Sequence, residues 1–417
     1  MNPDDRNIIT LVKQQYERFP YPVAIESLEQ FISSGARQGG CPSLCFHWYW
    51  PYRAKTDDLD ILIAGCGTSQ AAKIAVNVPG ARVTAIDISE RSIEHTRMLL
   101  RKHGITNVEL HLLPVEQVAS LKKRFDLIFA TGVLHHLADP VVGMTELRRA
   151  LRTDGSIYVM LYGKYGRDGV YYLQELIRRV GLTAMNATSD DLDAIVSLIN
   201  HLPRYHSFSA KREFFGDNMQ VAEELVDLFL HPQDRGYSIP DIYDLLARCG
   251  LKMQRVLLRA HYDPRCSALR DMKLYQRVRK LPLPDQFAVG ELFRAASLMH
   301  FFIACPNERA DDTYITDIQC DHWRELIPVR HPMIDIKPSH ASNTGAQILS
   351  SPQHQFPDIQ YSLPGRESAF FRRINGERSV GEIMTTVGLG ASDDSAAQWV
   401  RNFLEDLDAH DFIWLRG

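Results

Sequence analysis

The chain contains the run Asp60-Ile61-Leu62-Ile63-Ala64-Gly65-Cys66-Gly67-Thr68-Ser69, which is apolar until it meets two closely spaced glycines. Residues 70–76 follow with the spacing of an amphipathic helix. Glycines between a strand and a helix let backbone N–H groups approach a ligand closely. We therefore predict a strand, a glycine turn and a helix that form one wall of a ligand site.

A second apolar run, Val83-Thr84-Ala85-Ile86, ends in an acid, Asp87, about twenty residues after the glycines. A carboxylate at the end of the second strand can accept hydrogen bonds from both hydroxyl groups of a ribose. The glycine turn and the distant acid together predict a βαβ unit that binds an adenosine-containing cofactor. Gln70 stands where a dinucleotide site needs a third glycine, and the Gly-Lys-Ser/Thr of a P-loop is absent.

Strands and helices continue to alternate after this unit. Further strands are predicted at 108–112, 125–131 and 156–161, and the helices between them have caps at Ser89 and at Asp139-Pro140. Strands resume at 251–260 and 298–305, with a helix over 285–296 between them. Such strand–helix units predict an α/β fold whose parallel sheet is covered on both faces.

The parts outside the sheet core (56–161) have other patterns. Residues 1–55 hold a helix and a dense aromatic run, and we predict that they cover the sheet or form a lid over the ligand. Residues 162–247 are helical by spacing and are predicted to be an insertion beyond the carboxyl ends of the strands, where open α/β sheets bind ligands. The remaining ranges are 248–310, which completes the sheet, 311–354, a linker, and 355–417, three short helices and a strand that suggest a winged helix.

Composition bears on the partners and the location. The net charge is -4 at pH 7, so no broad basic surface for nucleic acid is expected. No signal peptide and no membrane span is predicted, because the N-terminus is polar and acidic and the apolar runs are short. Seven scattered cysteines indicate a reduced, cytoplasmic protein. Cys41 and Cys45 lack a complementary Cys or His pair, so no metal site is predicted. The oligomeric state is not indicated.

Four motifs, in order, resemble those of the class I S-adenosylmethionine-dependent methyltransferases. They are residues 61–68 at the first strand, 83–89 at the second, 125–137 at the fourth and 151–156 before the fifth. The resemblance implies a Rossmann-like, seven-stranded methyltransferase sheet, with S-adenosyl-L-methionine as the cofactor. It is strongest over 58–165 and extends to the later strands.

The resemblance also implies a set of cofactor-binding residues. They are Gly65, Cys66 and Gly67 along the methionine part, Asp87 and Ile88 at the ribose, Val115 and Glu116 at the adenine, and Thr131 and Gly132 near the sulfonium. The chain departs from the family pattern at three places: Ile63, where an acid is common, Ser69, where a further glycine is common, and Leu113-Pro114, where an acid is expected. Adenine recognition is therefore left to Glu116 or to the backbone.

Methyl transfer depends mainly on positioning, because the sulfonium already activates the methyl group for in-line attack. A general base assists when the acceptor is a hydroxyl or a protonated amine. His135 and His136 follow the fourth strand, beside the expected place of the methyl group, and Tyr21 is a third catalytic candidate. The two histidines either act as base or substrate ligand, or only shape the turn.

Four residues are candidates for binding the acceptor, namely Tyr16, Tyr162, Tyr165 and Arg167. The alternative for each is packing against the inserted helices or within the N-terminal segment. Residues 16–22 also resemble the start of uncharacterised bacterial methyltransferases. Residues 370–383 resemble the small winged-helix domains that recognise leader peptides, and a packing or dimerisation module is the alternative. The many acids of this tail oppose DNA binding.

The sequence thus predicts an S-adenosylmethionine-dependent methyltransferase that acts on an oxygen or nitrogen atom of a small molecule or of a peptide or protein. The alternative is a non-catalytic protein that binds S-adenosylmethionine as a scaffold or sensor.

Overall fold

The computed structural model describes residues 3–216, 219, 221–338, 346–390 and 393–417. The chain divides into two compact units. The first unit comprises Met1–Phe46, Lys55–Met253 and Ala295–Arg309, and the second comprises His47–Ala54, Gln254–Arg294 and Ala310–Gly417. Among the described residues, no helix has both the length and the apolar composition needed to cross a bilayer.

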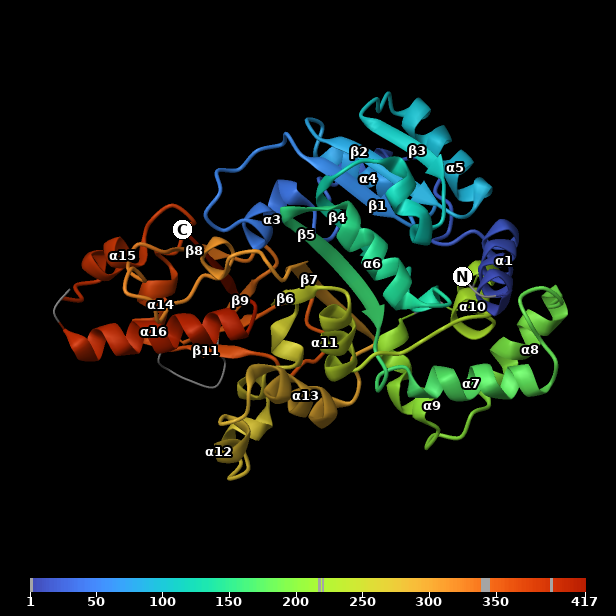
Figure 1. Cartoon of the computed structure of the whole chain (residues 1–417). Helices are drawn as coiled ribbons and strands as arrows, with labels where there is room; N and C mark the ends of the chain where they lie inside the picture. Colours follow the sequence, from blue (N-terminus) through green and yellow to red (C-terminus); the bar gives the residue numbers. More distant parts are fainter. Residues whose placement is uncertain (1–2, 217–218, 220, 339–345, 391–392) are drawn as a thin grey trace. The chain divides into compact units, whose positions relative to one another are not determined.

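The first unit is built on a seven-stranded sheet with the order β3-β2-β1-β4-β5-β7-β6 (Figure 1). Strands β1 to β5 are parallel, and β7 runs antiparallel to β5. The predicted α/β fold with a Rossmann-like, seven-stranded sheet is confirmed. The strands are β1 Asp60–Ala64, β2 Arg82–Asp87, β3 Val108–Leu112, β4 Phe125–Thr131, β5 Leu151–Tyr162, β6 Leu251–Val256 and β7 Met299–Pro306.

Helices cover both faces of this sheet because its central strands are apolar on both sides. Leu62 and Ile128 pack with α6 (Pro140–Ala150) and α11 (Ile239–Arg248) in one core. On the side of β2 and β3, α4 (Gln70–Asn77) and α5 (Glu90–Lys102) make the contacts. The predicted caps are confirmed, since Ser89 accepts a hydrogen bond from the N–H of Ser92 and Asp139 accepts one from that of Val141.

Strand β5 begins five residues earlier than the predicted 156–161, so the motif at 151–156, which was placed before the strand, belongs to it. The register of β5 against β4 shifts between Phe125 and Leu127. Arg152 forms ion pairs with Asp126 of β4, the neighbouring strand, and with Asp60 of β1, the next strand along the sheet. These contacts tie the start of β5 to the centre of the sheet.

Helix α1 (Pro3–Arg18) and the helices of the insertion stand toward the carboxyl end of β5 (Figure 1). The inserted helices share a core of their own, to which Phe19 of the N-terminal segment also packs. Helix α11 differs from the prediction, because it belongs to the core of the sheet although it lies within 162–247. The helices are α1 Pro3–Arg18, α2 Glu29–Ser33 and α3 Pro42–Tyr49 before the sheet, and α7 Asp168–Arg179, α8 Ser189–Asn200, α9 Ser207–Lys211 and α10 Ala222–Phe229 in the insertion.

Two predicted ranges cross the border between the units. Residues 47–54 lie in the second unit, where Trp48 contacts His331 and Trp414, so the segment 1–55 is not one lid. Residues 254–294 also lie in the second unit, although 248–310 was expected to complete the sheet. In both cases an aromatic or apolar pattern predicted that the segment is buried. Such a pattern does not specify which core the segment joins.

The second unit contains a three-stranded sheet, a two-stranded sheet and five α-helices among its described residues. The predicted linker 311–354 is wrong for much of its length, since it contributes β8, β9 and β10, and its residues 339–345 lie outside the described part. The boundary at 355 does not hold either, because β12 pairs with β8 and Trp323 shares the core of α14 and α16. The elements are β8 Ile327–Arg330, β9 Asp335–Pro338, β10 Gln347–Ser350, β11 Tyr361–Leu363, β12 Ile413–Arg416, α12 Tyr275–Val278, α13 Leu283–Arg294, α14 Gly365–Phe371, α15 Val380–Thr386 and α16 Asp394–Ala409.

Candidate functional site

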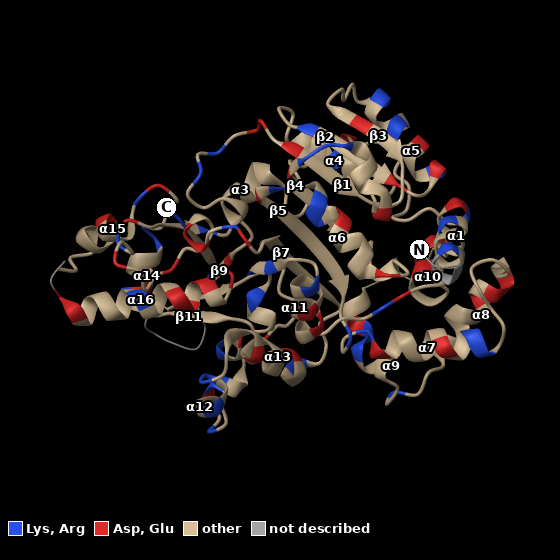
Figure 2. Ribbon diagram, viewed as in Figure 1, with Lys and Arg blue, Asp and Glu red and all other residues tan. Residues whose placement is uncertain are grey.

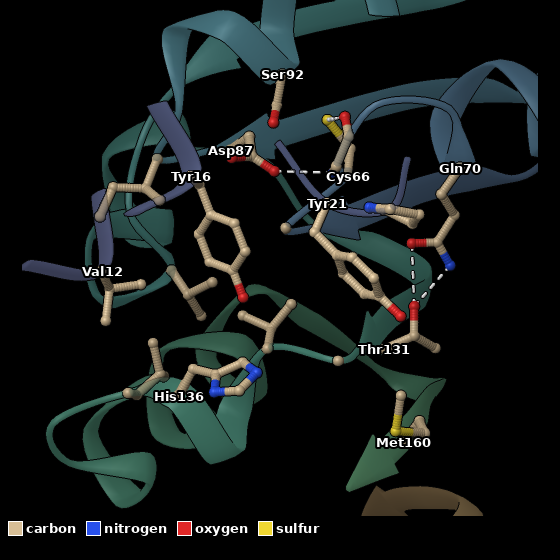
Figure 3. A pocket seen from close by; sticks show the side chains of 18 of the residues that line it. Val12, Tyr16, Tyr21, Cys66, Gln70, Asp87, Ser92, Thr131, His136 and Met160 are labelled. Atoms are coloured by element: carbon tan, nitrogen blue, oxygen red, sulfur yellow. Dashed lines mark hydrogen bonds between the residues drawn. The ribbon is translucent and has the colours of Figure 1, made fainter. Parts of the chain in front are cut away.

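A cavity of about 400 Å³ lies in the first unit, at the carboxyl ends of the parallel strands (Figure 3). Its volume is within the usual range for small-molecule sites. All nine residues that the sequence singles out for the cofactor line it: Gly65, Cys66, Gly67, Asp87, Ile88, Val115, Glu116, Thr131 and Gly132. The catalytic candidates Tyr21 and His136 and the acceptor candidates Tyr16 and Tyr162 line it too.

The glycine turn after β1 is packed so tightly that side chains do not fit. Gly65 has a φ of +71°, and a Cβ there would lie 2.3 Å from Cγ2 of Val133. Gly67 has a φ of +53°, and a Cβ there would lie 2.9 Å from Cδ of Pro22. Both positions therefore require glycine for conformation and for space.

Asp87 is a buried carboxylate at the end of β2. Its Oδ2 accepts a hydrogen bond from the N–H of Gly67 at 2.8 Å, and its Oδ1 accepts one from the N–H of Ser89 at 2.9 Å. Burial raises the pKa of Asp87 to about 6, and the backbone hydrogen bonds oppose that rise. The side chain thus faces the cavity from a fixed position and is mostly ionised at neutral pH.

The other walls differ in polarity. Leu113, Pro114 and Val115 form an apolar wall after β3. Across the cavity, the amide of Gln70 and the hydroxyl of Thr131 are hydrogen bonded at 2.6 and 3.0 Å (Figure 3). This bond links the first turn of α4 to the end of β4.

Two tyrosines converge on one acid of the insertion. The hydroxyl of Tyr16 donates to Oδ1 of Asp227, and that of Tyr162 donates to Oδ2, each at 3.2 Å. Figure 3 shows the phenol group of Tyr16 pointing toward His136, whereas that of Tyr21 points toward Thr131. Burial raises the pKa of Asp227 and that of Tyr21, the latter to about 12. Tyr21 is therefore a hydrogen-bond donor at neutral pH and not a base.

The main chain of Gln233 fixes the tautomers of two stacked histidines, His136 and His231. Its carbonyl oxygen lies 2.8 Å from Nδ1 of His136, so Nδ1 carries the proton and Nε2 has a free lone pair. Its N–H donates to Nδ1 of His231 at 3.1 Å, so His231 carries its proton on Nε2. That nitrogen lies 3.2 Å from the hydroxyl of Tyr16. His136 is consequently the histidine with a proton-accepting nitrogen at the cavity.

His135 does not line the cavity. Its ring stacks on Tyr162 with a centroid distance of 3.8 Å, and neither of its ring nitrogens has a hydrogen-bond partner. Burial lowers the pKa of His135 well below its usual range. Its placement is that of a neutral packing residue under Tyr162.

Arg167 and Tyr165 also lie away from the cavity. The guanidinium of Arg167 lies over the ring of Tyr162, 3.6 Å from its centroid, and pairs with Asp234 at 3.2 Å. Both charged side chains are almost fully buried. Arg167 therefore supports the wall of the cavity from behind, and the backbone oxygen of Tyr165 accepts a hydrogen bond from Lys211.

Replacing Arg167 by Ala is expected to lower the free energy of unfolding by about 3–5 kcal/mol, because Asp234 would remain charged, buried and unpaired. Urea unfolding followed by circular dichroism measures this change. The matched control is Arg178→Ala, which removes an exposed ion pair to Glu175 on the same helix and should change the stability by less than about 1 kcal/mol. Equal losses in the two variants would contradict the structural role of Arg167.

His136, Asp227 and His231 each place one possible ligand atom within 4.8 Å of the others. Two features oppose a metal ion there. The rings of His136 and His231 stack at 3.7 Å, so their lone pairs do not converge, and Nδ1 of His231 faces an N–H donor, which keeps Nε2 protonated. The cluster is better suited to protons and polar ligands than to a metal.

The sequence did not single out Asp227, His231 and Lys73, which also take part in this region. Asp227 stands in a run with two other acids, Glu223 and Glu224, and its spacing does not separate it from them. Only the fold brings it to Tyr16 and Tyr162.

Residues 55–197 match the family model described as a methyltransferase domain. An uncharacterised protein of Synechococcus sp. is 24% identical over 67% of this chain and 69% of its own length. A malonyl-[acyl-carrier protein] O-methyltransferase of Acetivibrio thermocellus is 31% identical, but over 29% of this chain and 42% of the relative.

The fold is also similar to a solved structure, PKMT2 of Rickettsia typhi in complex with AdoHcy. The TM-score is 0.64 and the identity 13%, over 90% of this chain and 75% of that chain. The family match and the sheet order agree with the motifs found in the sequence. Residues 55–197 therefore match a methyltransferase domain, and the sheet that contains them has the Rossmann-like methyltransferase fold.

Proposed function

We propose that this protein transfers a methyl group from S-adenosyl-L-methionine to an oxygen or nitrogen atom of a small molecule or of a peptide or protein. One observation carries the proposal. The residues expected to bind the cofactor and one residue able to act as a base, His136, line the same cavity.

The residues present fit the cofactor. The carboxylate of Asp87 would accept hydrogen bonds from the ribose hydroxyls, and the wall of Leu113, Pro114 and Val115 would cover the adenine, with Glu116 at its edge. Lys73 and the uncapped first turn of α4 would attract the carboxylate of the methionine part. Gly65 and Gly67 leave room for the chain of the cofactor to pass.

The bound cofactor supplies a methyl group on a sulfonium, which is activated for attack. The protein contributes position and proton transfer. Nε2 of His136 would accept the proton of the attacking group, while the Gln233 carbonyl holds the imidazole in the required tautomer. Tyr21 would donate a hydrogen bond to the acceptor, and Tyr16 and Tyr162 would exclude water from the reacting atoms.

Calorimetric titration with S-adenosylmethionine and with S-adenosylhomocysteine tests the proposal. The wild type should bind both ligands, and Asp87→Ala should weaken both about 10- to 100-fold, because the ribose loses a charged acceptor. A folded wild type that binds neither ligand would overturn the proposed function. Unchanged binding by Asp87→Ala would overturn the ribose assignment alone.

The affinity for S-adenosylmethionine is expected to fall as the pH is lowered through about 6, since the pKa of Asp87 lies there before the ligand binds. Below that pH the carboxyl is protonated and must lose a proton to accept the ribose hydroxyls, which lowers the affinity by up to about tenfold per pH unit. Titrations from pH 5 to 8 measure the slope. Asp87→Ala is the control and should remove this step from the profile.

The alternative, a non-catalytic protein that binds S-adenosylmethionine, predicts binding without turnover. The free lone pair of His136 at the cavity favours catalysis over this alternative.

Three further points stay predictions: the winged-helix-like character of 355–417, the cytoplasmic location and the absence of a nucleic-acid partner. Acidic side chains predominate on α16 (Figure 2), which supports the last of these.

A further inference from the structure

We propose that the carboxylate of Asp227 and the phenol groups of Tyr16 and Tyr162 form a subsite that binds the methyl acceptor as a primary ammonium ion, beside His136. This inference rests on the proposed function and narrows its acceptor atom to an amine nitrogen.

Asp227 is a buried carboxylate without a cationic partner. Only 5% of the residue is exposed, and its two carboxylate oxygens accept hydrogen bonds from neutral phenols. The nearby guanidinium of Arg167 is paired with Asp234 instead. Within the described part of the chain, no Lys, Arg or His forms an ion pair with Asp227. Because a buried, uncompensated charge is unfavourable, a cationic ligand at this place would relieve that cost.

The shape of the subsite suits an ammonium group. A carboxylate offers about four lone-pair positions, and the phenols use two of them, so acceptors remain for the N–H groups of a ligand. Tyr16 and Tyr162 both reach Asp227 with their hydroxyl groups, and aromatic faces attract cations. A neutral hydroxyl group could donate only one hydrogen bond to the carboxylate and would have no charge for the aromatic faces to attract.

The charges of the whole cavity agree with this choice. Among its described lining residues, Asp87, Glu116 and Asp227 carry carboxylates, whereas Lys73 alone carries an ammonium or guanidinium group. The cavity therefore favours positively charged contents. S-adenosylmethionine, with a net positive charge, and an ammonium acceptor together would balance it.

The chemical step then follows from the positions of the groups. Nε2 of His136 takes one proton from the ammonium ion, which leaves a neutral amine and an imidazolium. The lone pair of the amine forms the new N–C bond, and the C–S bond breaks with its electron pair passing to sulfur. The products are a methylammonium ion and S-adenosylhomocysteine. Asp227 holds the nitrogen beside His136 and compensates its positive charge before the proton leaves and again after the methyl group is transferred.

The experiment uses two small probes of similar size, n-butylammonium and n-butanol, added to the full-length protein saturated with S-adenosylhomocysteine. Saturation-transfer NMR measures the affinity for each probe. The wild type should bind n-butylammonium at least about tenfold more tightly than n-butanol. Asp227→Asn should lower the ammonium affinity about tenfold and leave the n-butanol affinity unchanged. The control Asp193→Asn makes the same side-chain change at an exposed position of α8 and should affect neither probe.

Several outcomes would overturn the inference. Equal affinity of the wild type for the two probes would do so without any variant. Unchanged ammonium binding by Asp227→Asn would do so as well, provided that its affinity for S-adenosylhomocysteine shows that it is folded. Zn²⁺ binding that requires Asp227 and displaces n-butylammonium would identify a metal site instead. A selective loss of S-adenosylmethionine over S-adenosylhomocysteine in Asp227→Asn would assign the carboxylate to the sulfonium. Absence of S-adenosylhomocysteine binding in the wild type would instead refute the proposed function.

Discussion

Replacing His136 by Asn is expected to slow methyl transfer about 10²- to 10⁴-fold, the usual contribution of a general base. Nδ1 of His136 donates to the Gln233 carbonyl, so Nε2 keeps a lone pair that can accept a proton. His136 lines the cavity, and Asn would provide no comparable base there. The measurement is transfer of a labelled methyl group from S-adenosylmethionine to the acceptor fraction of a lysate, or to a saturating amine. The affinity for S-adenosylhomocysteine should change by less than about threefold, because His136 is not among the groups assigned to the cofactor.

The kinetic constants separate a base from a merely structural residue. If His136 accepts the proton, His136→Asn should lower kcat and leave the KM for S-adenosylmethionine nearly unchanged. His201→Asn is the matched control, since His201 is exposed at the end of α8 and should leave both constants unchanged. A His136→Asn enzyme that keeps its rate within about twofold would show that the base lies elsewhere.

Replacing Gly65 by Ala is expected to abolish detectable binding of S-adenosylmethionine. The new Cβ would lie 2.3 Å from Cγ2 of Val133, a distance that non-bonded carbon atoms do not adopt, so Val133 or the turn must move. Val133 follows Gly132, which lines the same cavity, and either movement would displace the wall beside the reacting centre. Calorimetric titration of the folded variant measures the loss.

A matched control separates the contact from the backbone. Gly104 has a φ of +62°, close to that of Gly65, but a Cβ there would have nothing within 4 Å. Gly104→Ala should therefore lose about 1–2 kcal/mol of stability from the left-handed conformation and keep its affinity for S-adenosylmethionine. The double variant Gly65→Ala with Val133→Ala should recover part of the binding, because the clashing methyl group is gone. Failure of this rescue would show that conformation, and not crowding, accounts for the loss.

The sheet and the cofactor wall were predictable because their signals are local. A strand, two glycines and a helix occupy one continuous stretch, and Asp87 ends the next strand. Each of these patterns is set by neighbours in the sequence, so the bounds of β3 and β4 were predicted as observed. The nine residues expected at the cofactor line one cavity for the same reason.

The acceptor side was not predictable because it depends on contacts between distant segments. Tyr16 and Asp227 are 211 positions apart, and their contact requires the insertion to fold back toward α1. The sequence left open whether Arg167 and Tyr162 bind the acceptor or pack, and it contained no sign that one would support the other from behind. The aromatic run near Trp48 failed in a similar way, since an apolar pattern states that a residue is buried and not in which unit.

The hydrogen bonds from position 233 to the two histidines come from the main chain, so the Gln side chain itself contributes nothing to them. Nineteen of the twenty amino acids can therefore occupy position 233 without changing either tautomer, and proline is the exception because it has no N–H. The constraint falls on the number of residues from His231 to Asp234. An engineer who reshapes this site can vary the side chain at 233 freely but should treat the length of that segment as fixed.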